Sequence, residues 1–173
     1  MLHLIEAGDF PQVYEIMEQS FPKEEYRPYD AQRDLLKKKE YKIYGTRDDT
    51  GRIIGFLAIW ELPGLLFIEH FAVRKECRNC GIGSELLQSL LERYSSTACL
   101  EVELPQNTLT KRRIAFYERN GFALNEFPYK QPSLGDGREP VPLRIMTTGG
   151  HLSPKEFQRC KTLLYTIVYG VEA

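Results

Sequence analysis

The sequence lacks the features by which membrane proteins, secreted proteins and nucleic-acid-binding proteins are usually recognised. No apolar run approaches the roughly 18 residues that a membrane-spanning helix requires. The 23 basic and 24 acidic residues nearly cancel, which leaves no cationic excess to meet nucleic-acid phosphates or anionic lipids. The N-terminus has no basic stretch followed by an apolar one, as a signal peptide would. We therefore expect a cytoplasmic protein with neither nucleic acid nor membrane among its partners.

Cysteine is also scarce, with four residues in a chain of 173. Without a leader sequence, these cysteines are expected to be reduced thiols and not a disulfide framework. Cys77 and Cys80 have the C-x-x-C spacing of a redox pair, and such a pair could also supply two ligands to zinc. Because two further zinc ligands at compatible spacing are absent, we expect no metal. A thiol-redox function of this pair stays open as an alternative.

What the sequence does contain is the composition and patterning of a single globular domain. Hydrophobic residues make up 42% and charged residues 27%, both near the averages of folded proteins. Apolar runs predict strands at 41–44, 52–60, 65–73, 98–104, 122–127 and 141–147, and the run 52–60 favours a strand covered on both faces. Apolar residues at helical spacing predict helices at 10–21, 30–38, 82–94 and 108–119, and a last one from 153. This mixture of hairpins and crossovers predicts a mixed sheet covered by helices.

The last predicted helix begins with an unusually complete set of start signals. Ser153 is placed to cap it, Pro154 occupies its first position, and Glu156 completes a capping box. An apolar stripe then runs from Phe157 to Val171, and such a stripe must be buried. It can pack on the same chain or on a second copy, so both a monomer and a homodimer are open. We favour packing within the chain, because one helical stripe suffices to cover an exposed sheet face.

The segment from Val73 to Ser84 has the pattern of an anion-binding loop. A strand ends, a short loop follows, and a helix begins at two closely spaced glycines, Gly81 and Gly83, with Arg78 beside them. Backbone N–H groups at a helix N-terminus point outward where the helix dipole is positive, and glycine lets phosphate oxygens approach closely. A pyrophosphate would fit this loop, although the third glycine of the dinucleotide-binding fingerprint is absent. The alternative is a helix that begins with glycines only for packing.

Two motifs, in this order, resemble the GCN5-related N-acetyltransferase (GNAT) family. Residues 78–83, R-N-C-G-I-G, are similar to the family signature R/Q-x-x-G-x-G/A, and residues 117–122, Y-E-R-N-G-F, are similar to its Y-x-x-x-G-F element. The resemblance implies an α/β fold with a central, mixed and mostly antiparallel sheet of about seven strands, splayed in the middle and flanked by helices. It assigns residues 1–148 to an N-acetyltransferase domain and leaves 149–173 as a C-terminal helical extension packed on that domain.

The same resemblance implies that acetyl-CoA is the co-substrate and that no metal takes part. The acceptor would be a primary amine, which could be a small amine, an amino-acid derivative or a protein amine. Backbone N–H groups at the end of the strand 65–73 would stabilise the oxyanion, and the basic start of the helix 108–119 would reach the 3′-phosphate or be merely exposed. The residues expected at the cofactor are Phe71, Ala72, Val73, Arg78, Asn79, Cys80, Gly81, Ile82, Gly83, Ser84 and Arg112. The alternative function is a non-catalytic acyl-CoA-binding sensor or regulatory module.

Glu69 is the candidate general base, because an alkylammonium titrates near ~10.4 and must lose a proton before it attacks a thioester. Spermidine/spermine-type members of the family carry their base four residues before the final valine of this strand, the position that Glu69 holds. Phe67 and Phe71 flank it on the same strand face, and this apolar setting predicts a raised carboxyl pKa. The alternative is a strand residue that reaches the sheet edge or pairs with an arginine. His70, on the opposite face, is a lesser candidate and is expected to be a hydrogen-bonded core histidine.

Tyr117 is the candidate general acid, because a phenol hydrogen-bonded to the leaving thiolate of CoA can protonate it. The alternative is a core tyrosine in an aromatic helix. Glu101 and Glu103 share one strand face and, together with Glu69, would make the acceptor pocket acidic and favour a cationic amine; otherwise they form a solvated face. Tyr26 lies in the loop expected to join the first two helices, where the family binds its acceptor, and is a candidate substrate contact.

Overall fold

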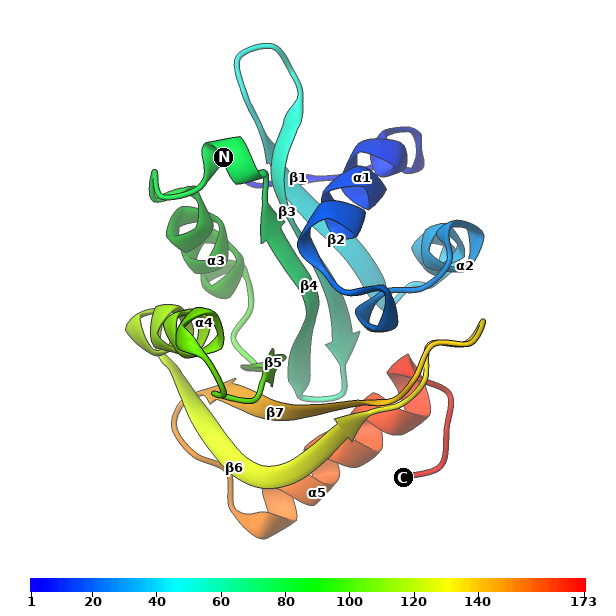
Figure 1. The fold of residues 1–173 in the computed structure, drawn as a ribbon, viewed down its shortest axis with the longest axis vertical. Coiled ribbons are helices and arrows are strands. Elements are labelled where there is room, and N and C mark those ends of the chain that lie inside the picture. Colours follow the sequence, from blue (N-terminus) through cyan, green and yellow to red (C-terminus); the bar gives the residue numbers. More distant parts are fainter. The chain divides into compact units, whose positions relative to one another are not determined.

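The computed structural model describes all residues from 1 to 173 and contains an α/β fold (Figure 1). Seven strands form one sheet in the order β1-β2-β3-β4-β5-β7-β6. The strands are β1 His3–Leu4, β2 Tyr41–Arg47, β3 Ile53–Leu62, β4 Leu65–Val73, β5 Thr97–Glu103, β6 Phe122–Gln131 and β7 Val141–Thr148. The helices are α1 Phe10–Ser20, α2 Tyr29–Asp34, α3 Ile82–Arg93, α4 Thr108–Arg119 and α5 Pro154–Leu163. The predicted fold class, a seven-stranded sheet flanked by helices, is therefore confirmed.

The chain divides into two compact units, which are described separately. The first contains residues 1–61 and 68–95, and the second contains residues 62–67 and 96–173. Strand β4 begins in the second unit and ends in the first. None of the helices combines the length and the apolar character that crossing a membrane demands.

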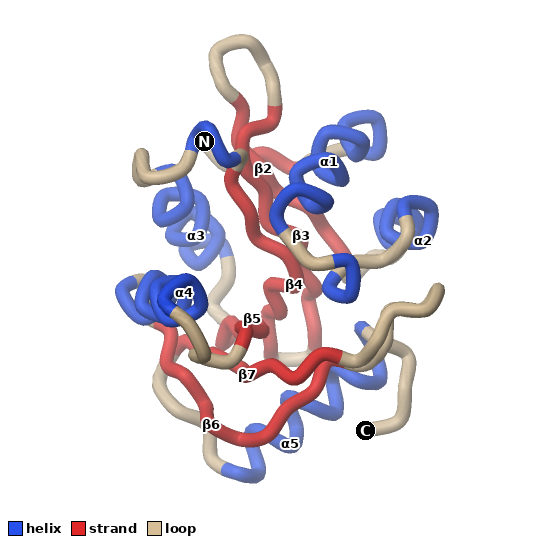
Figure 2. The backbone as a smooth tube through the Cα atoms, viewed as in Figure 1, coloured by secondary structure: helices blue, strands red, loops and turns tan.

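The first unit is built around β2, β3 and the end of β4. β1 pairs with β2 and β2 with β3, both antiparallel. Helices α1 and α2 lie to one side of these strands and α3 lies to the other (Figures 1 and 2). β3 is accordingly buried at every position except Glu61, as its continuous apolar sequence predicts. Gly55 permits the close approach of α3, because a Cβ there would lie 2.8 Å from Leu86 Cδ1.

The second unit contains the strands β5, β7 and β6, which pair in that order and are antiparallel. Helix α4 begins at a capping box: Asn107 Oδ1 accepts a hydrogen bond from the Thr110 backbone N–H at 2.9 Å, and Thr110 Oγ1 accepts one from the Asn107 backbone N–H. Just beyond its C-terminal end, Gly121 has a φ of +91°, which a residue with a side chain rarely adopts. The bounds of α4 agree with the helix predicted for 108–119.

Helix α5 begins at the predicted capping box. Ser153 Oγ accepts a hydrogen bond from the Glu156 backbone N–H at 3.3 Å, and Glu156 Oε2 accepts one from the Ser153 backbone N–H at 2.7 Å. The helix buries Phe157 and Cys160, and the Phe157 ring stacks on Phe127 of β6 with 4.6 Å between ring centroids. A π-helical turn at Leu164–Val168 continues it.

Strand β6 is longer than predicted, because it continues to Gln131, whereas the predicted strand ended at 127. The register with β7 shifts between Asn125 and Tyr129, so Pro128 lies in an irregularity of the ladder and not at a regular pairing position. β6 is also the last strand of the sheet order, and proline is tolerated at bulges and on edge strands. Helix α2 is shorter than predicted: it ends at Asp34, and a 3₁₀ turn at Leu35–Lys37 takes the place of the helix expected to reach 38. The two-residue strand β1 was not predicted, because it is too short to show a periodic pattern.

Candidate active site

The loop between β4 and α3 leaves an open helix N-terminus. Asn79 and Gly81 have φ values of +63° and +81°, in the left-handed region that disfavours a Cβ. Gly81 is the exposed N-cap of α3, and no atom lies within 4 Å of the position that a Cβ would occupy. The backbone conformation, and not close packing, therefore requires this glycine. Its open surroundings leave room for a ligand at the end of the helix, where backbone N–H groups lack intrahelical partners.

The Arg78 side chain connects this loop to the end of β4 and to α1. Its Nε donates to the Val73 carbonyl at 2.9 Å, and its Nη2 lies 3.4 Å from the Ser20 hydroxyl oxygen. The side chain is exposed, and these contacts use two of the five N–H groups of a guanidinium. Arg78 is thus positioned on the loop that was predicted to bind phosphate, and its contact with an anion remains a prediction.

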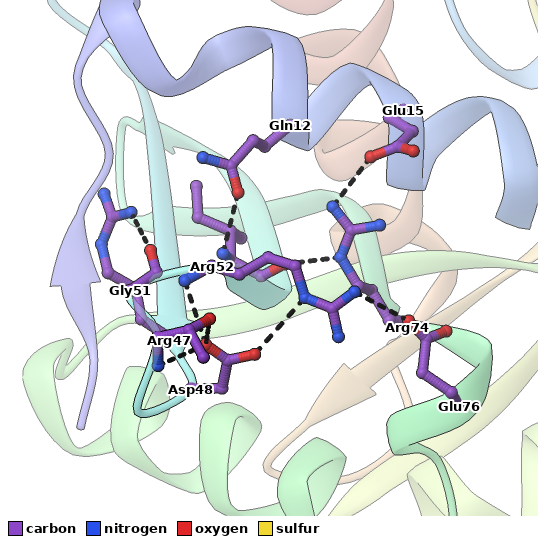
Figure 3. A network of polar contacts seen from close by, with 10 residues as sticks. Gln12, Glu15, Arg47, Asp48, Gly51, Arg52, Arg74 and Glu76 are labelled. Carbon is purple, nitrogen blue, oxygen red and sulfur yellow. Dashed lines mark hydrogen bonds and ion pairs between the residues drawn. The ribbon is translucent and has the colours of Figure 1, made fainter.

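Arg74 anchors the start of the same loop (Figure 3). This residue is only 6% exposed, its Nε donates to the Ile53 carbonyl at 2.7 Å, and its Nη2 donates to Glu15 Oε2 of α1 at 2.9 Å. Arg52 pairs with Glu76 in the loop, at 3.2 Å between Nη1 and Oε1. The sequence reasoning missed these anchors, although a charged residue directly after a buried strand is a signal that it needs a partner.

Glu69, near the end of β4, is a buried carboxylate with two strong donors. Arg27 Nη1 donates to its Oε1 at 2.7 Å, Trp60 Nε1 donates to its Oε2 at 2.9 Å, and its side chain is 3% exposed. Burial is the largest influence and raises the pKa of Glu69, but the charge of Arg27, the proximity of His70 and these hydrogen bonds outweigh it and hold the pKa below its ordinary value. The prediction of a raised pKa is therefore wrong, and the alternative of pairing with an arginine describes the structure.

The reason lies in tertiary contacts that the strand pattern does not contain. Phe67 and Phe71 make the strand face around Glu69 apolar in sequence, whereas Arg27 lies in a loop 42 positions before Glu69. No local pattern marks Arg27. Trp60 gave a usable signal, because a tryptophan in a buried strand needs an acceptor for its indole N–H.

His70 is buried beside Glu69, with only one ring nitrogen hydrogen-bonded. Its Nε2 lies 2.6 Å from the Glu25 carbonyl oxygen, and its ring packs edge-on against Phe21 with 5.1 Å between centroids. Its Nδ1 has no hydrogen-bond partner and lies 3.9 Å from Glu69 Oε2. Burial, chiefly, keeps the pKa of His70 below 6.5 against the opposing charge of Glu69. The histidine is buried, as expected, but it is not fully satisfied.

The loop that carries Tyr26 and Arg27 is held over the end of β4 by several contacts. The Tyr14 hydroxyl donates to the Arg27 carbonyl at 3.0 Å, and the Arg27 backbone N–H donates to Gln32 Oε1 at 3.1 Å. Tyr26 packs edge-on against the Tyr14 ring, with 5.7 Å between centroids. The loop contacts both residues of β4, Glu69 through the Arg27 side chain and His70 through the Glu25 carbonyl, whereas Tyr26 contacts the Tyr14 ring of α1.

Tyr117, in the second unit, lies among aromatic rings on α4. It is 8% exposed, and its ring centroid lies 5.3 Å from that of Phe116 and 5.9 Å from that of Phe122. Burial raises the pKa of Tyr117 to about 12, although the nearby charge of Arg113 opposes the shift. The phenol therefore keeps its proton throughout the neutral range, as a proton donor must. Arg112 of the same helix is exposed, and its contact with a phosphate stays a prediction.

The two acidic residues of β5 have partners and do not form a bare acidic surface. Glu101 Oε1 accepts hydrogen bonds from the hydroxyls of Tyr129 at 2.6 Å and Tyr169 at 2.7 Å. Glu103 is paired with Arg113 of α4. Because Glu69 is also paired, the three carboxylates offer less uncompensated negative charge than the alternative of an acidic acceptor pocket requires.

The cysteines are all free thiols, with Cys77 half-buried and Cys80 exposed. Cys99 of β5 and Cys160 of α5, which the sequence reasoning did not connect, lie buried with 3.9 Å between their sulfur atoms. No group of three or more His, Cys, Asp or Glu side chains is arranged to hold a metal ion. A hollow of about 710 Å³ beside β6 is lined by residues such as Leu124, and none of the predicted site residues lines it.

Comparisons with known proteins agree on one family. The family model described as "Acetyltransferase (GNAT) family" matches residues 10–122. A solved GNAT-family protein of Bacteroides thetaiotaomicron, provisionally named an acetyltransferase, is 33% identical and covers 99% of both chains, with a TM-score of 0.86. YjbC of Bacillus subtilis, also provisionally named an acetyltransferase, is 30% identical over 63% of this chain, and the match spans 55% of YjbC. A phosphinothricin acetyltransferase of Sinorhizobium meliloti, solved with AcCoA, is 20% identical with a TM-score of 0.62 and covers 85% of this chain and 86% of its own.

Proposed function

Since the chain belongs to the acetyltransferase (GNAT) family, we propose that it transfers the acetyl group of acetyl-CoA to a primary amine. The observation that carries this proposal is the exposed N-terminus of α3, where Gly81 has a left-handed backbone and open surroundings. The helix dipole and the backbone N–H groups there favour an anion such as the pyrophosphate of CoA. A side chain at position 81 would fill the space that the pyrophosphate needs.

Different segments of the first unit would bind different parts of acetyl-CoA. When bound, acetyl-CoA supplies a thioester that an amine can attack. The loop from Arg78 to Ser84 would hold its pyrophosphate, and the backbone of Phe71, Ala72 and Val73 would lie along the thioester and donate N–H groups to its oxygen. The buried Arg74 side chain fixes the start of the loop before the ligand arrives, which reduces the ordering that binding must cost.

Glu69 is proposed as the group that takes the proton from the acceptor amine. Its lowered pKa keeps it ionised at neutral pH, so it is always ready to accept a proton, although its affinity for that proton is reduced. Because Arg27 covers the carboxylate, an amine would reach it only when Arg27 moves aside or through a bound water. Tyr117 is proposed, on the family resemblance, as the donor that protonates the leaving thiolate, and its raised pKa keeps the necessary proton in place.

The acceptor is proposed to be a small amine, an amino-acid derivative or a peptide amine. The pairing of Glu69 with Arg27 removes most of the electrostatic attraction that a bare carboxylate would exert on a polycation. We therefore expect acceptors with a single amine to compete well with polyamines. Tyr26, in the loop over β4, is the proposed contact of the acceptor with this loop.

A second candidate function is an acyl-CoA sensor without turnover. The observation in its favour is the same Arg27–Glu69 pair, because a carboxylate that is 3% exposed and held by two donors resembles a structural anchor more than a free base. Both functions require acetyl-CoA to bind, and they differ only in whether an amine is acetylated.

An acetylation screen over the three acceptor classes separates the two functions. The purified chain would be incubated with acetyl-CoA and each amine, and the acetylated product would be detected by mass spectrometry. Titration of released thiol would need an enzyme-only blank, because Cys80 is exposed and accessible to the reagent. Turnover with any class that disappears in Tyr117→Phe supports the transferase. Tight acetyl-CoA binding without turnover on any class supports the sensor.

A further inference from the structure

Two proton-accepting atoms face one another in the buried interior of the first unit. Glu69 Oε2 and His70 Nδ1 are 3.9 Å apart, and the two side chains are 3% and 1% exposed. The carboxylate is held in place by Arg27 on one oxygen and by Trp60 on the other. Nδ1 has no hydrogen-bond partner of its own. Buried polar atoms are nearly always partnered, so this exception asks for an explanation.

The hydrogen bond on the far side of the ring fixes which nitrogen carries the proton. His70 Nε2 lies 2.6 Å from the Glu25 carbonyl oxygen, and a carbonyl can only accept. The assignment of a proton to Nε2 follows from this contact. In a neutral ring, Nδ1 then carries a lone pair directed toward the Glu69 side. The imidazole is therefore held in the tautomer that can accept one more proton at that atom.

With a neutral ring, the lone pair of Nδ1 faces the negatively charged Glu69 carboxylate, which is unfavourable. Protonation of Nδ1 would turn this contact into an ion pair. The charged groups that face the ring are the Glu69 carboxylate, which favours the imidazolium, and the Arg27 guanidinium, which disfavours it. The Glu25 carbonyl also favours the charged form, and Phe21 supplies only an apolar ring edge. Burial keeps the pKa of His70 below its ordinary value, so the ring is neutral before the reaction and free to accept a proton. Glu69, whose own pKa is lowered, retains a proton poorly.

We propose that His70 is a positioning and proton-relay residue, which takes from Glu69 the proton that leaves the acceptor amine. The inference rests on the proposed acetyl transfer. Once Arg27 has moved aside from the carboxylate, the N–H bond of the ammonium breaks, its electron pair stays on nitrogen, and the proton bonds to Glu69 Oε2. As the carboxyl group turns toward the ring, that O–H bond breaks and an Nδ1–H bond forms on His70. The imidazolium, paired with Glu69, returns the proton to solvent after the product leaves, so no proton is gained or lost.

The decisive variant is His70→Gln. This substitution removes the basic Nδ1, and its amide nitrogen retains a donor for the Glu25 carbonyl. Turnover would be measured as kcat/KM across pH, with His151→Gln, which removes an exposed imidazole, as the matched control. We expect His70→Gln to lose about 10²-fold in kcat/KM, in the range of a general acid–base group, and to lose the acidic inflection set by the imidazole. His151→Gln should keep both. A His70→Gln enzyme with the wild-type rate and pH profile would show that His70 only anchors the loop.

A measurement without turnover tests the tautomer in the intact protein. Nitrogen chemical shifts of the histidine side chains should show His70 neutral and protonated on Nε2 at neutral pH, with a pKa below 6.5. A proton on Nδ1 at neutral pH would overturn the proposal, because the accepting atom would already be occupied. If wild type acetylates no amine, the proposed function itself fails; if wild type is active and His70→Gln is unchanged, only the relay fails.

Discussion

Replacing Gly81 with valine should abolish the thermal stabilisation that acetyl-CoA confers, while leaving the protein folded. A residue with a Cβ at this left-handed φ of +81° costs roughly 1–2 kcal/mol. No atom lies within 4 Å of the added Cβ, so packing adds no clash to that cost. For a chain of this size about 1 kcal/mol corresponds to about 2–4 °C in Tm, so the free variant should melt about 2–8 °C below wild type.

Wild type and Gly81→Val should differ most in the Tm shift that acetyl-CoA produces. Acetyl-CoA at about 100 times its Kd stabilises the folded state by about 2.7 kcal/mol, which is about 5–11 °C in Tm. In Gly81→Val the valine side chain occupies the space beside the helix end, so the pyrophosphate loses its place and the shift should vanish. The assay is a thermal melt followed by dye fluorescence, repeated across acetyl-CoA concentrations.

Gly149 supplies a matched control. It has a φ of +80°, it is exposed, and no atom lies within 4 Å of the position that a Cβ would take there, but it follows β7 and is outside the proposed loop. Gly149→Val should therefore lose a similar amount of intrinsic stability and keep the full acetyl-CoA shift. Equal shifts in wild type and Gly81→Val would refute the phosphate-loop interpretation. Loss of the shift in both variants would show that the effect comes from general destabilisation.

Three further predictions concern the remaining parts of the molecule. Glu69→Gln removes the negative charge that compensates the buried Arg27 guanidinium and should cost roughly 3–5 kcal/mol at neutral pH in urea unfolding. Because the pKa of Glu69 is lowered by folding, wild type should lose this stabilisation as the pH falls from the unfolded value of ~4.3 through the folded one, and Glu69→Gln should show a flatter acid limb. Tyr117→Phe should lower kcat by about 10²-fold with little change in the KM for acetyl-CoA; a near-wild-type kcat would remove its role as proton donor. Truncation after Gly149 should lower Tm and promote aggregation, seen by light scattering, because it uncovers the faces of Cys99 and Phe127. If the intact protein is a dimer and the truncated one a well-folded monomer, the C-terminal helix is an oligomerisation element.

The sequence predicted well those elements whose ends carry local signals. β4 and α4 have the predicted bounds, and α5 begins where Ser153 and Glu156 indicated. In each case the boundary is determined by neighbouring residues, such as a cap, a proline or a change of apolar period. β6 was cut short because Pro128 is a reliable break in a regular strand and an unreliable one at an irregularity on an edge.

The conformation of the β4–α3 loop could be expected from local sequence, whereas the electrostatics of Glu69 could not, and the site residues themselves stay a prediction. Gly81 and Asn79 could be placed in a phosphate-type loop, because positive φ values are a property of short local segments. The lowered pKa of Glu69 could not be predicted, because it depends on Arg27 and Trp60, which only the fold brings to the carboxylate. The same holds for the contact between Cys99 and Cys160, which are 61 positions apart in the sequence.

The irregularity in β6 also bears on how the protein behaves at high concentration. A regular outermost strand presents a row of backbone donors and acceptors on which another chain can add a strand, as in fibrils. In β6 the register shift between Asn125 and Tyr129 bends that row, and Pro128 removes one donor from it. Glu126 and Lys130 place opposite charges on either side of the proline. The last strand is therefore a poor template for fibril-like growth, although it is long enough to be a good one.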